Sequence, residues 1–274
     1  MAGSLALLAS IVGLLGLKET LPSAVRRNTS KTHAADQGTE TEPLLSESTS
    51  VGAIESAEIP PLHALFVRPV LISLTTHGFL CFCQMSYEVL VPLVYATPIA
   101  NGGLGLSPLY IGRIYGAVGL VNTFTQIFLS ARLIRYFGPR TIYITAFCVL
   151  TLSFLAYPLL NYFARAAGHV DGRVIAVMVF QMSSAFVVFP TFACTQMFIV
   201  DSAPMPNSLG GVNGLAQMVA STCRSVAPTI SASLFSLSVR HGLLGGNLVF
   251  FILAGMALCA VRAAQMLPSR LKTG

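Results

Sequence analysis

The chain has 274 residues, of which 54% are hydrophobic and 9% are charged, and its mean hydropathy is +0.74. A soluble domain carries about 25% charged residues, so this composition excludes an ordinary water-facing domain and indicates a membrane protein. The net charge of +6 does not indicate a nucleic-acid partner, because the basic residues are scattered between apolar runs and form no patch.

The first apolar run covers residues 3–17, which is short for a helix that crosses a bilayer. No basic residue precedes Lys18, so a secretory signal peptide is not favoured. We expect residues 1–17 to be the end of a spanning helix whose beginning lies outside this sequence. Residues 18–68 are rich in Ser, Thr and Glu, and we predict that they form a disordered linker.

Two short motifs lie in this linker. Glu40 followed by Leu44 and Leu45 resembles an acidic dileucine sorting signal, although a chance pair of leucines in a linker is the alternative. As a sorting signal it favours the vacuolar membrane slightly over the plasma membrane, and both stay open. Asn28, Thr29 and Ser30 match a glycosylation sequon, whose use would test on which side of the membrane the linker lies.

The rest of the chain, residues 69–274, contains runs that each reach the roughly 20 apolar residues needed to span a bilayer. Each run is bounded by Pro, Gly, Asn or a charged residue, and the links between runs are short. All should be helices, because an open strand cannot satisfy its backbone hydrogen bonds in hydrocarbon. The sequence therefore predicts an all-α membrane protein with a six-helix transmembrane half-bundle at about 69–96, 109–130, 141–163, 174–200, 211–238 and 247–267.

The distribution of Lys and Arg predicts the orientation. Ten of them fall in the 18–68 linker, the loop at 131–140 or the C-terminal segment, whereas Arg165, Arg173 and Arg240 fall on the other side. This bias predicts a multi-pass integral membrane protein whose linker, 131–140 loop and C-terminus are cytoplasmic.

The first span of the half-bundle carries a polar stripe. At about 100° per residue, one helix face holds Ser73, His77, Cys81, Gln84 and Glu88. Polar groups are costly in lipid, so this face should meet the bundle interior or a water-filled cavity. The alternative is hydrogen bonding between helices. Glu88 is the acid within a predicted span, and for it we favour a functional role.

Arg224 lies near the middle of the span at 211–238 and shares a face with Asn213, Gln217 and Ser231. Such a charge needs a partner or an aqueous cavity. Three roles stay open: binding the anionic group of a ligand, pairing with an acid that changes protonation, or capping carbonyl groups near Pro228. Glu88 lies roughly 9 Å from the centre of its own helix.

Because Arg113 of the next span lies at a depth similar to that of Glu88, we expect these two residues to pair. Gln181 could line a cavity or pack, with no preference between them, and the same holds for Ser184, Thr191 and Thr195. Three glycines at small-residue spacing predict close approach to a neighbouring helix. These glycines are Gly112, Gly116 and Gly119.

Nothing in the sequence predicts an enzyme. It contains no P-loop, HExxH or GxSxG motif and no paired acids on one span, so no catalytic residue is proposed. The spacing of Cys81 and Cys83 does not indicate a metal site, and we expect neither a metal nor another cofactor.

Three stretches resemble a known family. These are "GLLGLKETLP" at the end of the first apolar run, "PLVYATPIANGGLGLSPLYIG" over residues 92–112 and "NGLAQMVASTCRSVAPTISASLF" over residues 213–235. Together with the layout, they resemble the C-terminal half of a fungal major facilitator superfamily (MFS) transporter, of a drug-antiporter-like or zinc-induced-facilitator-like branch. The stretch "ARLIRYFGPR", with Arg132, Arg135 and Arg140, resembles a repeated cytoplasmic loop of that family but lacks its acidic residue. The resemblance makes these three arginines candidates for a gating or ion-pair role.

The resemblance implies secondary active transport of a small solute by alternating access, coupled to protons. Glu88 and His77 are then the candidate proton carriers, and Arg224, Gln84, Asn213, Gln217 and Gln181 complete the candidate pathway. The implied partners are the lipid bilayer, a small-molecule substrate and either a missing N-terminal half or a second copy of the chain. The alternatives are a truncated fragment that does not transport, or a receptor-like signalling protein with seven spans.

Overall fold

The computed structural model describes residues 66–205 and 208–268 of the chain. The expectations for the first apolar run, for the dileucine motif and sequon of the linker and for the C-terminal Arg270 and Lys272 lie outside the described residues.

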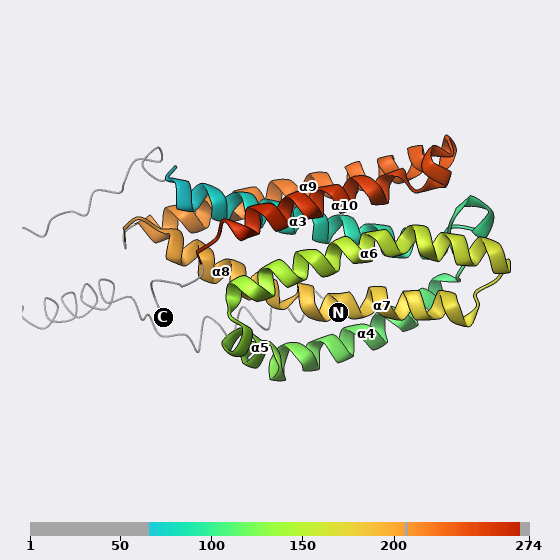
Figure 1. Ribbon diagram of the computed structural model, residues 1–274, viewed down its shortest axis with the longest axis horizontal. Coiled ribbons are helices and arrows are strands. Elements are labelled where there is room, and N and C mark those ends of the chain that lie inside the picture. The colour runs from blue at the N-terminus through green and yellow to red at the C-terminus, as the bar shows by residue number, and fades with distance from the viewer. Residues whose placement is uncertain (1–65, 206–207, 269–274) are drawn as a thin grey trace, which may run out of the picture. The chain divides into compact units, whose positions relative to one another are not determined.

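The described residues form helices and no strand, which confirms the predicted all-α class. The helices run back and forth beside one another along the long axis of the view (Figure 1). Their bounds are α3 (Arg68–Ala96), α4 (Pro108–Phe128), α5 (Ser130–Phe137), α6 (Pro139–Ala167), α7 (Gly172–Val188), α8 (Pro190–Ser202), α9 (Leu209–Arg240) and α10 (Leu248–Gln265), with short 3-10 helices η2 (Ile99–Asn101) and η4 (Leu243–Gly246).

Proline sets the starts of α3, α4, α6 and α8, where it occupies the first or second position of the helix. Its fixed φ suits the first turn, and its missing N–H would have no partner there. Pro190 consequently divides the predicted span at 174–200 into α7 and α8. Together these two helices still form one candidate span over Gly172–Ser202.

The prediction of a loop at 131–140 is wrong over most of that range, because the chain forms α5 there. This helix bends by 54° from α4, and Gly138, with a φ of 78°, ends it before Pro139 begins α6. Leu133 and Ile134 pack against the core, whereas the arginines of α5 are exposed. The basic residues had suggested a loop, but the alternation of apolar and basic residues is that of an amphipathic helix.

Four stretches are long and apolar enough to cross a membrane: Arg68–Ala96, Pro139–Ala167, Gly172–Ser202 and Leu248–Gln265. A fifth joins them if the bent pair α4 and α5 counts as one span. α9 is outside this set, because Arg224 and its many serines lower its hydropathy. At 1.5 Å per residue it would extend about 48 Å, more than the roughly 30 Å of a hydrocarbon core. The span at 211–238 stays a prediction.

The main core lies among α3, α6, α7 and α10 and is rich in aromatic rings. Tyr157 stacks on Phe250 with 4.4 Å between the ring centroids, which joins α6 to α10. Other large side chains fully buried in this core are Tyr95, Tyr143, Phe147 and Phe154.

α9 and α4 are attached to this core very differently. α9 packs closely along α3, where a Cβ atom on Gly78 would lie 3.1 Å from Val219 Cγ1. In α4, Ile111 is the one buried residue. The predicted close packing of Gly112, Gly116 and Gly119 is wrong within the described residues, since a Cβ atom on any of them would meet nothing within 4 Å.

The turn between α3 and α4 is held by the chain's own backbone. The amides of Leu104 and Leu106 donate to the carbonyl oxygens of Val94 and Tyr95 at 3.2 and 2.9 Å, and Gly105 N donates to Thr97 O at 2.8 Å. Gly103 lies at the centre of this turn, where a Cβ atom would overlap the carbonyl oxygens of Val94 and Thr97. A glycine at 103 therefore positions the start of α4 beside the end of α3.

We predict that Gly103→Ala lowers the free energy of unfolding by at least about 2 kcal/mol, because the turn must distort to admit the methyl group. Unfolding of the purified chain in detergent measures this. Gly112→Ala is the matched control and should be neutral or stabilising by up to about 1 kcal/mol, since its Cβ would lie in open space within a helix. Equal stability of the two variants would contradict the role given to the turn.

Candidate functional site

The polar stripe of α3 is divided between the bundle interior and its open face. Ser73, His77, Cys81 and Gln84 are buried, whereas Glu88 is exposed. Ser73 Oγ donates to the carbonyl oxygen of Phe198 in α8 at 3.5 Å. The Ser73 end of the stripe therefore joins helices, and the Glu88 end opens into a cavity.

Arg224 lies midway along α9 and is exposed in the described bundle. Its guanidinium carbon is 5.8 Å from the centroid of the Phe192 ring in α8, which is within the range of a cation–π interaction. It also interacts electrostatically with His77 and Cys81 across the α3–α9 contact. Among the described residues, its neighbours are thus an aromatic ring, an imidazole and a thiol, and no ion pair is formed.

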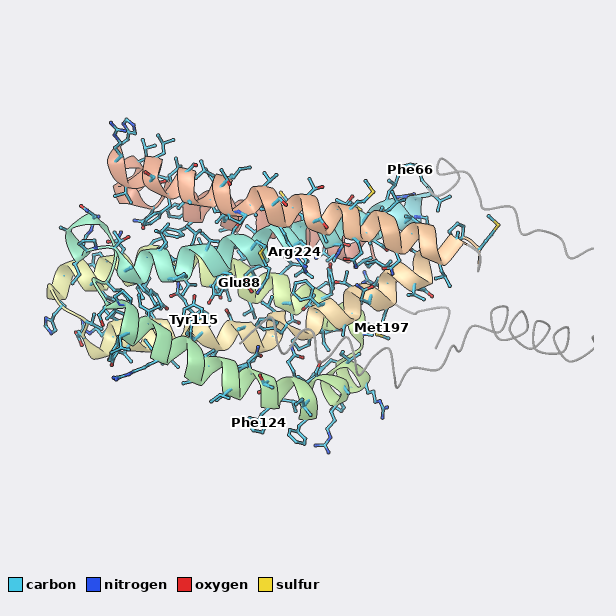
Figure 2. The ribbon with its side chains drawn as sticks, turned by 180° about the vertical axis from the view of Figure 1, so that it is seen from behind. Phe66, Glu88, Tyr115, Phe124, Met197 and Arg224 are labelled. Atoms are coloured by element: carbon cyan, nitrogen blue, oxygen red, sulfur yellow. The ribbon has the colours of Figure 1, made fainter. Side chains whose placement is uncertain are left out.

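The thiol of Cys81 interacts with both His77 of α3 and Arg224 of α9. Its sulfur is 3.8 Å from His77 Nε2, one helical turn away. Figure 2 shows Arg224, Glu88 and Tyr115 between the helix ends rather than at them. The described charges of the candidate site therefore lie along the helices and not at their ends.

Glu88 accepts a hydrogen bond from Gln84 Nε2 at 2.8 Å. The predicted ion pair with Arg113 is wrong for this structure, in which Arg113 is exposed and no such pair forms among the described residues. Instead, Tyr115 is the side chain of α4 beside Glu88. Positions two apart on a helix point about 200° apart, so a helix that turns Tyr115 toward α3 turns Arg113 away from it.

A cavity of about 390 Å³ lies beside Glu88, between α3, α4 and α7. Asn122 Oδ1 is buried in this region and has no hydrogen-bond partner among the described residues. The cavity thus offers a carboxylate and a free amide oxygen, both acceptors, among aromatic rings. Its lining is Gln84, Tyr87, Glu88, Tyr115, Val118, Gly119, Asn122, Met182, Ala185 and Phe189.

The predicted polar face of α9 is also divided. Asn213 and Gln217 are exposed, as is Arg224. Ser231 is fully buried and donates to Ser86 Oγ of α3 at 2.7 Å. α3 therefore covers this face of α9 near Ser231 and leaves it open near Asn213 and Gln217, which helical spacing alone could not distinguish.

Gln181 is fully buried and binds three helices together. Its Oε1 accepts from the Tyr95 hydroxyl at 3.1 Å, and its Nε2 donates to the carbonyl oxygen of Ser153 at 3.3 Å. Its backbone carbonyl also accepts from the Tyr87 hydroxyl at 2.5 Å. The structure places this candidate in the packed core and not on the cavity surface.

The basic residues expected to act in gating occupy different settings. Arg140 Nη2 donates to the carbonyl oxygen of Gln265 at 2.6 Å, which ties the start of α6 to the end of α10. Arg132 and Arg135 are exposed on α5. Arg140 therefore stabilises the bundle, whereas the other two are free to contact lipid headgroups or a further chain.

Two kinds of residue near the site escaped the sequence analysis. Asp201 is buried in the last turn of α8 and lines a second cavity, of about 290 Å³, together with Arg68 and Ser73. Its signal was an acid directly after an apolar run, which had been placed just beyond the predicted span. Phe192 and Tyr115 had no signal, because aromatic residues are common in apolar helices.

No group of three His, Cys, Asp or Glu side chains that could hold a metal ion occurs in the part of the chain that the structure describes.

Comparison with known proteins gives one family. The family described as "Major Facilitator Superfamily" matches residues 1–228. No solved structure gives a significant match.

Three curated relatives show the extent of the similarity. "Major facilitator-type transporter psiT2" of Psilocybe cubensis is 27% identical over 94% of this chain and 53% of its own length. "Major facilitator superfamily multidrug transporter mfsB" of Aspergillus fumigatus is 25% identical over 75% of the chain and 36% of its own length. "Protein ZINC INDUCED FACILITATOR 1" of Arabidopsis thaliana is 26% identical over 68% and 38%. The chain spans about half the length of the first of these relatives.

We predict that Gln181→Ala lowers the free energy of unfolding by about 2–4 kcal/mol, because the Tyr95 hydroxyl and the Ser153 carbonyl lose their buried partner. Gln217→Ala removes the same side chain from an exposed position and should change stability by no more than about 0.5 kcal/mol. Unfolding of the two variants in the same detergent measures the difference, and a small loss for Gln181→Ala would count against its role in joining the helices.

Proposed function

The chain belongs to the major facilitator superfamily, and from this membership we propose that it forms one half-bundle of a secondary transporter for a small solute. Two of the relatives that it resembles are named as transporters, one of them for multiple drugs. Because the chain spans about half the length of the first relatives, the activity of a whole transporter is part of the proposal.

The observation that carries this proposal is the exposure of two charged side chains away from the helix ends, Glu88 within the apolar helix α3 and Arg224 midway along α9. A charged side chain at the centre of a bilayer costs at least about 2.5–3.5 kcal/mol if it faces lipid. Neither residue is ion-paired within the described bundle, so each should face water or a further helical layer. A solute pathway between two half-bundles provides both.

In this proposal the open sides of α3, α4, α8 and α9 form one wall of the pathway. Secondary transporters of this architecture bind their solute near the membrane midplane, between two repeats, and rocking of one repeat against the other exposes the site to each side in turn. The opposite wall would come from an N-terminal half-bundle or from a second copy of the chain.

The two charged residues would have different tasks. Glu88 would carry the coupling proton, since a carboxylate beside a cavity can gain and lose a proton as its surroundings change, and Gln84 would hold it in place. Arg224 would contact an anionic group of the solute or an acid of the opposite wall. His77, which is buried beside Cys81, would act as a secondary proton carrier.

The ends of the bundle have a proposed orientation as well. α5, the start of α6 and the end of α10 would face the cytoplasm, in a multi-pass protein of the plasma membrane or the vacuolar membrane. Arg132 and Arg135 would then lie at the negatively charged cytoplasmic surface, as the positive-inside rule expects.

Glu88→Gln, introduced into the native gene, should reduce proton-driven transport at least about tenfold, as loss of a charged interaction of about 1.5–3 kcal/mol implies. Sealed membrane vesicles with an imposed pH gradient measure it, with rhodamine 6G and fluorescein as cationic and anionic probes. An ionophore that dissipates the gradient should abolish transport by the unchanged protein. Gradient-driven transport that is indifferent to Glu88→Gln would exclude this residue as the proton carrier.

Arg224→Gln should lower transport of the preferred probe at least about tenfold, because the charge on the open face is lost. Arg113→Gln is the matched control: it removes an exposed arginine that points away from the cavity, and transport should stay within about twofold. The same vesicle assay compares the two. Equal losses would show that the loss of any exposed arginine, and not its position on the open face, determines the effect.

A further inference from the structure

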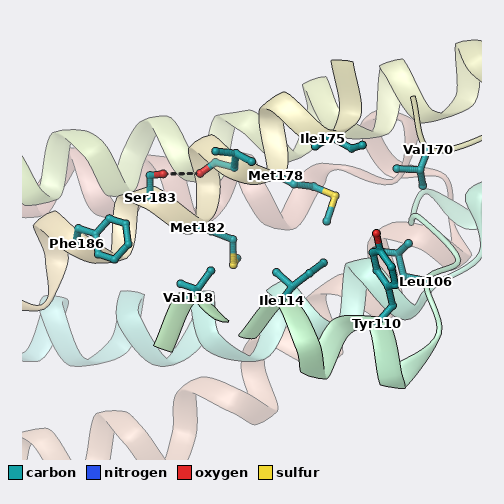
Figure 3. Close-up of a pocket in the computed structure, with 11 residues that line it drawn as sticks. Leu106, Tyr110, Ile114, Val118, Val170, Ile175, Met178, Met182, Ser183 and Phe186 are labelled. Carbon is teal, nitrogen blue, oxygen red and sulfur yellow. Dashed lines mark hydrogen bonds between the residues drawn. The ribbon is translucent and has the colours of Figure 1, made fainter. Parts of the chain in front are cut away.

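A third cavity, also of about 290 Å³ and distinct from the one beside Asp201, lies between α4 and α7 and is shown in Figure 3. On α4 its wall is formed by Tyr110, Ile114 and Val118, which are four residues apart and so share one helix face. On α7 the principal wall residues are Met178 and Met182. The remaining lining residues are Leu106, Val170, Ile175, Val179, Ser183 and Phe186.

This α4–α7 cavity is apolar. None of its lining residues is charged, and the hydroxyl of Ser183 is engaged by its own helix, donating to Val179 O at 2.7 Å. Methionine side chains adapt to occupants of different shape, because they are unbranched and polarisable. The cavity therefore suits a hydrocarbon or aromatic group and offers little to a polar one.

The α4–α7 cavity adjoins the cavity beside Glu88. Val118 and Met182 line both of them. The apolar volume and the acceptor-rich volume thus share a wall made of one flexible and one small side chain. A single ligand that extends past Met182 could occupy both.

The cavity beside Glu88 favours a cation. Its polar atoms include the Glu88 carboxylate and Asn122 Oδ1, a buried acceptor without a partner among the described residues. Tyr87, Tyr115 and Phe189 surround them. Carboxylates and aromatic faces both attract ammonium groups, and an unpartnered acceptor is satisfied by an N–H donor. Arg224 interacts with Phe192, His77 and Cys81, none of which lines this cavity.

We propose that the two cavities form one two-part binding site for an amphipathic organic cation. Its protonated amine contacts Glu88 and Asn122, and its apolar body lies between α4 and α7. The proposal rests on the proposed transport function and names the substrate class of that site. Glu88 then carries either a proton or the ammonium group at different stages, since both neutralise the same carboxylate.

The test measures equilibrium binding of 4-phenylbutylammonium, and of the neutral 4-phenylbutanol, to the full chain reconstituted in lipid nanodiscs. The amine should bind at least about tenfold more tightly than the alcohol. Glu88→Gln should remove that preference. If amine and alcohol bind alike to the unchanged chain, the site has no selectivity for cations and the proposal is overturned.

Ile114→Trp fills the α4–α7 cavity and should weaken binding of the amine at least about tenfold. Leu120→Trp is the matched control on α4, because Leu120 is 66% exposed and lines neither cavity, and its effect should stay within about twofold. If Ile114→Trp binds as tightly as the unchanged chain, the apolar body lies elsewhere and the two-part site is excluded.

Ile114→Ala keeps the proposal testable should the tryptophan variant fail to fold. It enlarges the cavity and should shift the preference by about fivefold from 4-phenylbutylammonium toward the bulkier 4-(1-naphthyl)butylammonium. An unchanged preference would contradict the assignment of the cavity. Failure of this proposal is distinct from failure of the transport function: gradient-driven transport that depends on Glu88 would persist in the first case and be absent in the second.

Discussion

The cost of placing polar and charged groups in hydrocarbon is the constraint on which the rest of this structure depends. It excludes strands with open edges and leaves helices that satisfy their own backbones. A polar side chain is therefore stable in two settings, either hydrogen-bonded between helices or open to a face that lipid does not cover. The described residues contain clear examples of both.

The buried polar groups join helices. Gln181 connects α7 to α3 and α6, and Ser231 connects α9 to α3 through Ser86. Ser238 of α9 accepts from the amide of Val249 at 3.2 Å, which satisfies a free N–H in the first turn of α10. Such bonds fix the relative positions of helices more specifically than contacts between apolar side chains alone.

The unequal attachment of α4 and α9 suits a protein that moves. α9 is held closely to α3 where Gly78 permits it, whereas α4 has little buried surface and bears exposed apolar side chains such as Leu120 and Phe124. α4 also forms one wall of both cavities of the two-part site. A shift of this helix would therefore change the two-part site without disturbing the aromatic core among α3, α6, α7 and α10.

The sequence by itself determined the all-α class, most of the helix positions and the presence of the charges Glu88 and Arg224 within helices. It could do so because hydropathy, proline and rare charges act locally, through the cost of exposing each group to lipid. The tertiary structure alone decided how each polar residue is used. Helical spacing gave Gln181 no preference between cavity and core, and only the surrounding helices place it in the core. Helical spacing placed Asn213 and Ser231 on the same face of α9, but the position of α3 decides which of the two is covered. That Tyr115 and not Arg113 shares a cavity with Glu88 depends on the rotation of α4 about its own axis, which follows from packing and is not encoded in membrane depth.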